Sequence, residues 1–345
     1  MSTQNSFPVL DVVGGARARG TAHGEALRER IASTFAFYMD DLFAGGPLDR
    51  TAIAGRAARI RELTSVYAPD MVEEIDGIAA GSGLEPWKIF VLNARTEIIN
   101  ARVNECSALF FVDHRVLAQN WDWLEPLEDL CVVIRHQHPD GHRHLAFCEP
   151  GMVAKIGMNS AGLGVCLNIL FAAHDLSGLA VHILIGALLN CRDFAQARDL
   201  LNQCGLGKAS HLLVAASSGE ALSMEYFGDT AHELEAQAGA LMHTNHCLGL
   251  GAAGRSADLA NSCARYDLLE AKVRRAEDLD VAAAKRILIS EEGGDDALMR
   301  AYTPQAFLGT QRVGTCATLV MELTEQRMHI RRGPTPQAQF TTLDV

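Results

Sequence analysis

The run "ECSALFFVDHRVLAQNWDW", residues 105–123, brings together side chains that can carry out acyl chemistry. It places Cys106 at the start of an alternating apolar segment and ends on the polar cluster Gln119–Asp122. A cysteine thiolate is a nucleophile, and a nearby carboxylate or amide can orient it or stabilise a developing charge. Buried cysteines are also common as small hydrophobic residues, so packing is the alternative explanation.

The spacing of this run predicts a β-hairpin. If residues 113–114 form a two-residue turn, the antiparallel register carries Cys106 opposite Trp121. Asp122 then lies close to the start of the first strand. A thiol that shares a neighbourhood with a carboxylate and an amide indicates a chemical environment. From spacing alone, a catalytic role and a packing role for Cys106 remain equally open.

The elements that must position this hairpin follow from the hydrophobic period. It is about 3.6 over the first hundred residues, changes to 2 at Cys106, and then alternates between the two. This order favours an α+β fold with helices packed on antiparallel sheets, and it leaves the topology open. We expect helices over 16–43, 56–64, 68–80, 85–101, 179–190, 194–203, 257–276 and 280–290. We expect strands over 107–112, 116–120, 131–137, 144–148, 154–159, 164–170, 211–215, 221–227, 232–238, 315–323 and 327–331.

Composition excludes several classes of protein. The 345 residues carry a formal charge of −12, which argues against binding to nucleic acid or to an anionic membrane surface. Nine cysteines, an odd number with no CxxC pair, are typical of a reduced intracellular protein. We see neither a secretory signal nor an apolar run of membrane-spanning length, so we expect a cytoplasmic protein.

Several separate motifs, in one order along nearly the whole chain, resemble the acyl-coenzyme A:6-aminopenicillanic acid acyltransferase family. Members of this family, also called isopenicillin N acyltransferases, are N-terminal-nucleophile (Ntn) hydrolases. The motifs are "GTAHGEA" (20–26), "LNARTEI" (92–98), "ECS" (105–107), "QNWDW" (119–123), "KIGMNSAGLGVCLN" (155–168), "HTNHCL" (243–248) and "CATLV" (316–320).

The resemblance implies a fold and a maturation step. The fold is a four-layer αββα sandwich of two antiparallel sheets flanked by helices. The precursor cleaves its own backbone between Glu105 and Cys106, which yields fragments 1–105 and 106–345. We expect the two fragments to stay together as a heterodimer within one composite domain, because separation would expose large apolar faces. No cofactor is implied.

The resemblance also assigns roles to individual residues. Cys106 is the nucleophile, and after cleavage its α-amino group serves as the base, because such a group titrates near pH ~8. Asn245 corresponds to the oxyanion-hole donor, and Asp122 to the aspartate that supports cleavage and the amine. His23 is expected to support the fold. The residues expected in supporting positions around the site are Asn120, His243, His246 and Thr315.

Two departures from the family pattern bear on the substrate. Glu105 stands where the penicillin-producing enzyme has glycine, and Thr315-Cys316 stand where it has arginine and glycine. A cation near the site is therefore missing, unless Arg312 replaces it, and a penicillin substrate is in doubt. We expect a small-molecule amide or acyl donor as the substrate, with a slight preference for amide hydrolysis.

Three alternatives stay open. The first is transfer of acyl groups from acyl-coenzyme A, although residues 204–211 lack the spacing of a phosphate-binding loop. The second is an uncleaved precursor that serves as a binding or scaffold protein. Finally, "RHQHPDGHRH" holds histidines 136, 138, 142 and 144 around a turn, as a metal-binding module would. Because turn tips are usually exposed and no further ligands complete a closed site, we expect adventitious metal affinity and no functional metal site.

Overall fold

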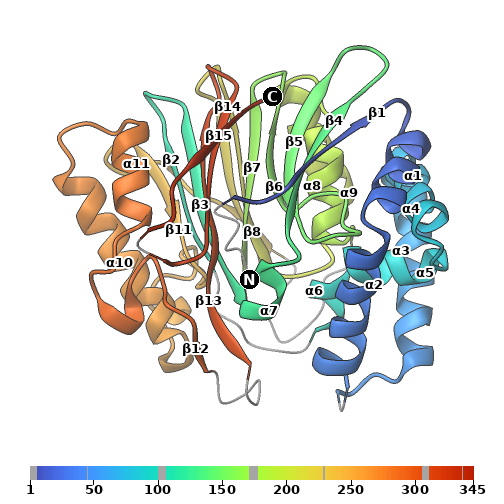
Figure 1. Cartoon of the computed structure of the whole chain (residues 1–345). Helices are drawn as coiled ribbons and strands as arrows, with labels where there is room; N and C mark the ends of the chain where they lie inside the picture. Colours follow the sequence, from blue (N-terminus) through green and yellow to red (C-terminus); the bar gives the residue numbers. More distant parts are fainter. Residues whose placement is uncertain are drawn as a thin grey trace.

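The computed structural model describes residues 6–44, 46–99, 106–170, 178–227, 230–304, 311–335 and 337–345. Two β-sheets stack face to face in the middle of the molecule, and helices cover the outer face of each (Figure 1). This is the four-layer αββα arrangement that the resemblance implied. Among the described residues, every helix is too short or too polar to span a membrane.

The long helices divide between the two outer layers (Figure 1). Along the chain they are α1 (Ala16–Ala26), α2 (Arg28–Ala36), a π-helical turn (Phe37–Leu42), α3 (Arg50–Tyr67), α4 (Pro69–Ser82), α5 (Pro86–Asn93), α6 (Arg95–Ile98), α7 (Glu125–Glu128), α8 (Val181–Leu189), α9 (Phe194–Cys204), α10 (Ala260–Arg275) and α11 (Val281–Leu288). Short 3₁₀ turns occupy Gly251–Gly254, Ala257–Leu259 and Gly294–Asp296. Helices α10 and α11 cover one sheet, and the remaining long helices lie on the side of the other.

The first sheet has the strand order β1-β4-β5-β6-β7-β8-β9-β10, and the second has β11-β2-β3-β13-β14-β15, with β12 beside β13. We call them sheet A and sheet B. The strands of sheet A are β1 (Val9–Val13), β4 (Val132–Gln137), β5 (Arg143–Cys148), β6 (Ile156–Asn159), β7 (Leu163–Ile169), β8 (Ser210–Ala216), β9 (Ala221–Phe227) and β10 (Thr230–Glu233). Those of sheet B are β2 (Cys106–Phe111), β3 (Val116–Leu124), β11 (Ala240–His243), β12 (Thr303–Pro304), β13 (Arg312–Glu322), β14 (Arg327–Arg332) and β15 (Thr341–Asp344).

Several elements differ from what the sequence predicted, among them the helix expected over 85–101, which is divided at Ala94 into α5 and α6. The single helix expected over 16–43 is broken at Leu27 and ends in the π-helical turn. The strand expected over 232–238 is two strands, β10 and β11, separated by a turn in which Gly239 has a φ of 77°. Strand β1 was missed, and it pairs in parallel with β4, so sheet A is not wholly antiparallel.

Helices α1 and α4 approach so closely that glycine is required on both. A Cβ atom on Gly20 or Gly24 of α1 would lie 2.0–2.3 Å from a backbone oxygen of α4, and one on Gly77 or Gly81 of α4 would lie 2.2–2.3 Å from a backbone oxygen of α1. Real Cβ atoms do not approach backbone this closely, so the two helices would have to separate. The glycines of the "GTAHGEA" motif therefore serve the packing of α1 against α4.

We predict that Gly77→Ala lowers the free energy of unfolding by about 3 kcal/mol, because the added methyl group overpacks the α1–α4 contact. The matched control is Gly55→Ala on α3, where a Cβ atom would meet nothing within 4 Å. There the same change should raise stability by about 1 kcal/mol, as alanine favours an exposed helix. Urea unfolding of both variants measures the difference, and equal effects would contradict the assignment.

His23 is held neutral inside the helical layer. Its Nε2 atom accepts a hydrogen bond from the backbone N–H of Gly151 at 3.1 Å. Burial, followed by the proximity of His136, lowers the pKa of His23 to about 3, while Glu74 acts in the opposite direction. An imidazole whose pKa falls from 6.5 to about 3 on folding adds stability above pH 6.5 that is lost as the pH falls toward 3.

From this we predict that the free energy of unfolding falls measurably as the pH is lowered below 6.5. Between pH 6.5 and pH 4, His23 should contribute up to about 1.4 kcal/mol per pH unit to the loss of unfolding free energy. His23→Gln keeps a hydrogen-bond acceptor for Gly151 but cannot take up a proton. It should therefore reduce the pH dependence of the unfolding free energy by the contribution of one proton. His114→Gln makes the same substitution at an exposed histidine and is the matched control. Urea unfolding at a series of pH values tests this, and an unaltered slope in His23→Gln would contradict it.

Candidate active site

Cys106 is the first residue of β2 and is buried, with 4% of its surface exposed. Strand β2 pairs with β3 in the predicted register, so Cys106 lies opposite Trp121. The two side chains belong to the apolar core between the sheets, and the ammonium of Lys155 lies 4.4 Å from the centre of the Trp121 ring. The thiol therefore faces the space between the two sheets, where β2 packs against β7. Glu105 lies outside the described residues.

Asn245 holds the backbone of Cys106. It lies in the loop that follows β11, and its Oδ1 atom accepts a hydrogen bond from the backbone N–H of Cys106 at 2.9 Å. Its Nδ2 atom donates to the carbonyl oxygen of Ile169 at 3.0 Å. The Asn245 side chain thus joins the start of β2 to the end of β7. It is placed next to the nitrogen that would become a free amine if the chain were cut before Cys106.

Arg265 of α10 contacts Cys106 directly and was missed by the sequence analysis. Its guanidinium donates to the Cys106 carbonyl oxygen at 2.7 Å, to Ser107 Oγ at 2.9 Å and to Asn245 Oδ1 at 2.9 Å. Burial lowers the pKa of Arg265 to about 10, while the Asp122 carboxylate acts to raise it, so the side chain stays cationic at neutral pH. Its place on the inward face of α10, at helical spacing with Ser262 and Leu269, was a signal that could have revealed it.

Asp122 lies on the opposite face of sheet B from the Cys106 thiol. Successive residues of a strand point to opposite faces, so Asp122 shares its face with Asn120. The Asp122 Oδ1 atom accepts a hydrogen bond from Thr315 Oγ1 at 2.7 Å, and Oδ2 is buried with no hydrogen-bond partner among the described residues. Burial raises the pKa of Asp122, while Arg300 and Arg265 act to lower it. Asp122 is thus coupled to Cys106 electrostatically, through Arg265.

The supporting residue Asn120 and the candidate replacement cation Arg312 both lie away from the thiol. Asn120 donates to the carbonyl oxygens of Leu288 and Leu298 at 2.7 Å each, so it fastens sheet B to the end of α11. Arg312 is exposed and pairs with Glu125, so it does not replace the missing arginine. The cation that reaches the site comes instead from α10.

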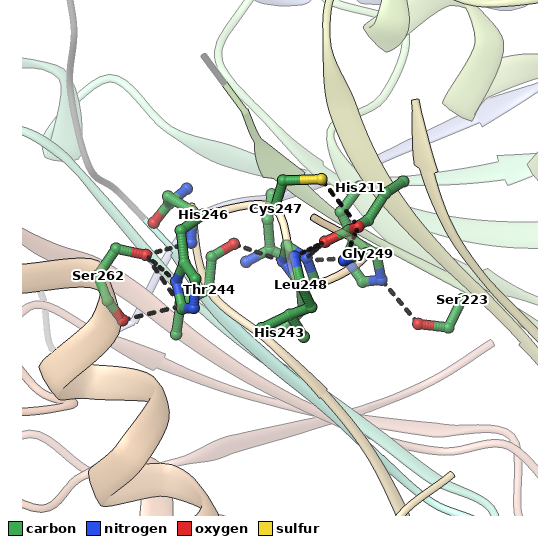
Figure 2. A network of polar contacts seen from close by, with 12 residues as sticks. His211, Ser223, His243, Thr244, His246, Cys247, Leu248, Gly249 and Ser262 are labelled. Carbon is green, nitrogen blue, oxygen red and sulfur yellow. Dashed lines mark hydrogen bonds and ion pairs between the residues drawn. The ribbon is translucent and has the colours of Figure 1, made fainter. Parts of the chain in front are cut away.

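Glu225 of β9 organises the loop that carries Asn245. Figure 2 labels its partners His243, Cys247, Leu248 and Gly249. One carboxylate oxygen accepts hydrogen bonds from His243 Nε2 at 2.7 Å and from the backbone N–H of Leu248 at 2.6 Å. The other accepts from the backbone N–H of Gly249 at 2.8 Å and from the Cys247 thiol at 3.1 Å. Burial acts to raise the pKa of Glu225, but these hydrogen bonds, led by that of His243, lower it to about 2.

A second set of contacts fixes the loop to α10 (Figure 2). Ser262 Oγ accepts a hydrogen bond from the backbone N–H of Asn245 at 2.7 Å and lies 3.0 Å from His246 Nδ1. Thr244 Oγ1 donates to the Ser262 carbonyl oxygen at 2.9 Å. His243, at the end of β11, and His246, in the loop that follows, therefore support the segment that positions Asn245, and neither makes a hydrogen bond to Cys106 among those of the described residues. Neither Glu225 nor Ser262 was singled out from the sequence.

Solved structures with a related course of chain were found at low sequence identity. A mutant conjugated bile acid hydrolase from Clostridium perfringens overlaps with a TM-score of 0.48 at 13% identity, covering 70% of this chain and 92% of that one. Penicillin V acylase from Agrobacterium tumefaciens gives a TM-score of 0.45 at 12% identity, covering 70% and 86%. The Caenorhabditis elegans ortholog of N-acylethanolamine-hydrolyzing acid amidase gives 0.45 at 14% identity, covering 70% and 100%.

Sequence comparison reaches further along the chain. The 40 kDa form of acyl-coenzyme A:6-aminopenicillanic-acid-acyltransferase from Emericella nidulans is 25% identical over 325 residues, which cover 91% of this chain and 89% of that protein. A family model described as acyl-coenzyme A:6-aminopenicillanic acid acyl-transferase matches residues 112–335. Because this match spans well over half of the sequence, the chain belongs to the acyl-coenzyme A:6-aminopenicillanic acid acyl-transferase family.

Proposed function

We propose that the chain is a self-processing cysteine enzyme that cleaves a small amide through a thioester on Cys106. The observation that carries this proposal is the contact of 2.9 Å between the Cys106 backbone nitrogen and Asn245 Oδ1, at the first residue of β2. A nitrogen held beside its own thiol is what an N-terminal nucleophile requires, because that nitrogen becomes the base once the preceding bond is cut. Family membership supports acyl transfer or amide hydrolysis as the class of reaction.

The first step is self-cleavage before Cys106. The thiol attacks the carbonyl carbon of Glu105, the peptide nitrogen takes up a proton and leaves, and a thioester forms between Glu105 and the cysteine sulfur. Water then hydrolyses this thioester, which yields the carboxylate of Glu105 and a free thiol and amine on Cys106. Asp122 and Arg265 would support this step by fixing the charge around the Cys106 carbonyl.

Turnover uses the new amine. A free α-amino group titrates near pH ~8, and a neighbouring cation such as Arg265 favours its neutral, basic form. The amine removes the thiol proton, the sulfur attacks the substrate carbonyl, and the oxyanion accepts a hydrogen bond from Asn245 Nδ2. Such a donor is worth roughly 3–4 kcal/mol in other enzymes. The leaving amine takes the proton, and water resolves the thioester.

Fragments 1–105 and 106–345 would stay together after cleavage. Strand β1, in the first fragment, pairs in parallel with β4 of the second, from Val9 opposite Val133 to Val13 opposite Gln137. The buried ion pair between Arg95 and Glu149, at 3.0 Å, also joins the two fragments. We therefore propose a heterodimer of the two fragments as the active form.

Hydrolysis and acyl transfer differ in the acceptor of the acyl group, which is water in the first and an amine in the second. Thr315 stands where the penicillin-producing enzyme has arginine, and its hydroxyl is engaged by Asp122, so we do not extend the relative's penicillin substrate to this chain. We favour hydrolysis of N-acyl or aminoacyl amides, since water is always present and transfer requires a second organised site. Acyl-coenzyme A remains the alternative donor.

A substrate panel tests this function. The purified chain is incubated with N-acyl amides, aminoacyl amides and acyl-coenzyme A, with and without added amines, and the products are measured by mass spectrometry. We expect free acids from the amides, and no product from Cys106→Ala. Transfer products that dominate at low amine concentration would overturn the preference for hydrolysis. Absence of any thioester-derived product would overturn the proposed function.

A further inference from the structure

The hairpin between β4 and β5 buries four histidines that the proposed reaction does not use. They are His136, His138, His142 and His144, and each is at most 9% exposed. The tip of the turn between them, residues 139–141, is exposed. The expectation of exposed imidazoles was therefore wrong. Arg19 of α1 lies against them on one side, and the carbonyl oxygen of Leu189 at the end of α8 lies against them on the other.

Three of these imidazoles have the spacing of metal ligands. One nitrogen from each of His138, His142 and His144 lies within 4.8 Å of the other two. His138 Nε2 and His144 Nδ1 are 3.4 Å apart. Two nitrogens bound at about 2.05 Å to a tetrahedral ion would be about 3.3 Å apart, so this pair already has the separation that such an ion requires. A hydrogen bond between two ring nitrogens would normally be shorter.

The surroundings favour the form of histidine that binds metals. Burial, followed by the charge of Arg19, lowers the pKa of His138 to about 3, and burial likewise lowers the pKa values of His142 and His144. All three are therefore neutral at physiological pH, with a lone pair on one ring nitrogen. Glu74, which lies 2.6 Å from Arg19, balances the nearby positive charge.

One ligand already has its outer contact in place. His142 Nε2 lies 2.8 Å from the Leu189 carbonyl oxygen, which only accepts, so Nε2 carries the hydrogen and Nδ1 holds the lone pair. Metal-binding histidines commonly donate their second N–H to a carbonyl in this way. A competing arrangement also exists, in which Arg19 donates to His138 Nδ1 at 3.4 Å and His138 Nε2 donates to His144. Metal binding at His138 Nε2 would move its proton to Nδ1 and displace Arg19.

We propose that His138, His142 and His144 bind one divalent transition-metal ion of the zinc and cobalt class. Three neutral imidazoles suit these ions, and the absence of a carboxylate or other oxygen ligand from the trio argues against calcium and magnesium. All three ligands belong to one hairpin, at the end of β5 farthest from Cys148, whereas Lys155 and Trp121 near Cys106 lie toward the other end. The ion would therefore brace the hairpin itself and hold His142 against the end of α8, and it would take no part in turnover.

The test is a titration of the full chain after a chelator and desalting have removed metal. Co²⁺ is added and followed by visible absorption, and Zn²⁺ is then used to displace it. We expect saturation at one equivalent, with the spectrum of four-coordinate cobalt bound to nitrogen and oxygen and with no thiolate bands in the near ultraviolet. The melting temperature should rise with Zn²⁺. Turnover should not change when the ion is removed.

Variants identify the ligands. His144→Gln should weaken Co²⁺ binding by at least about 100-fold. His114→Gln, the same change at an exposed histidine, should bind as the unaltered chain does. Cys106→Ala should also bind normally, which separates this site from a thiol and amine chelate at a processed Cys106. The metal-free melting temperature of His144→Gln shows whether that variant is folded.

Three results would overturn the proposal. The first is failure of the unaltered chain to bind one equivalent, a result that does not depend on any variant. The second is thiolate absorption bands, and the third is undiminished binding by a folded His144→Gln. Each would mean that the three imidazoles form only the hydrogen-bonded arrangement with Arg19.

Discussion

Replacing Cys106 by alanine is expected to lower turnover by roughly 10⁴-fold or more, because the reaction loses the only atom that bonds to the acyl group. The matched control is Cys204→Ala on α9, which removes a thiol of the same 4% exposure from a helix that carries none of the site residues. That variant should keep turnover within a few-fold of the unaltered chain. Steady-state rates on the best amide of the panel, measured beside melting temperatures, separate loss of chemistry from loss of fold.

Cys106→Ser sharpens this prediction. A hydroxyl can perform the same acyl shift and the same attack, but it is a poorer nucleophile, so cleavage of the chain should be slow and turnover low but measurable. Turnover by a folded Cys106→Ala that equals that of the unaltered chain would remove Cys106 from the mechanism.

Asn245→Asp is expected to reduce kcat by roughly 100-fold with little change in KM, because it removes the donor to the oxyanion in the transition state. The new carboxylate still offers an oxygen to the Cys106 nitrogen and to Arg265, which Asn245 Oδ1 contacts at 2.9 Å each. Chain cleavage should therefore still occur in this variant.

Asn245→Ala provides the comparison, because it removes the acceptor as well as the donor. Arg265 then loses one of its buried acceptors, and the free energy of unfolding should fall by about 2 kcal/mol more than in Asn245→Asp. Both variants are measured by kinetics and by urea unfolding. A normal kcat for Asn245→Asp would show that Asn245 only supports the structure around Cys106.

The central hairpin could be predicted from sequence because its determinants are local. Residues 113–114 fix the turn, the alternating pattern fixes the faces, and the register follows, so that Cys106 lies opposite Trp121 as expected. Strand β1 could not be predicted in the same way. Its five residues pair with β4, more than a hundred residues later, and no short-range pattern encodes that partner.

The candidate site shows the same division between local and distant information. The separate motifs were enough to identify the family. The sequence analysis placed Asp122 beside the thiol because the two residues are close along the paired strands, but their side chains lie on opposite faces of sheet B. The alternation of a strand already places Asp122 and Trp121 on opposite faces. Arg265 comes from a helix more than 150 residues after Cys106, and only the packing of α10 on sheet B brings its guanidinium to the Cys106 carbonyl.

The burial of the hairpin histidines could not be predicted from the sequence for a related reason. A His-Pro-Asp-Gly turn is typically exposed, and its tip is exposed here, but α1 and α8 cover the imidazoles beside it. Burial by distant helices is a tertiary effect that the turn sequence does not contain. It converts four ordinary surface residues into a buried cluster, which is why the inference about a metal ion required the structure.

The measurement that tests the central claim most directly is the intact mass of the purified chain under denaturing conditions, beside that of Cys106→Ala. We predict two polypeptides from the unaltered chain, the larger of which begins at Cys106, and a single full-length polypeptide from the variant. A single full-length mass from an unaltered chain that turns over amides would contradict the account, because Cys106 would then act without a terminal amine.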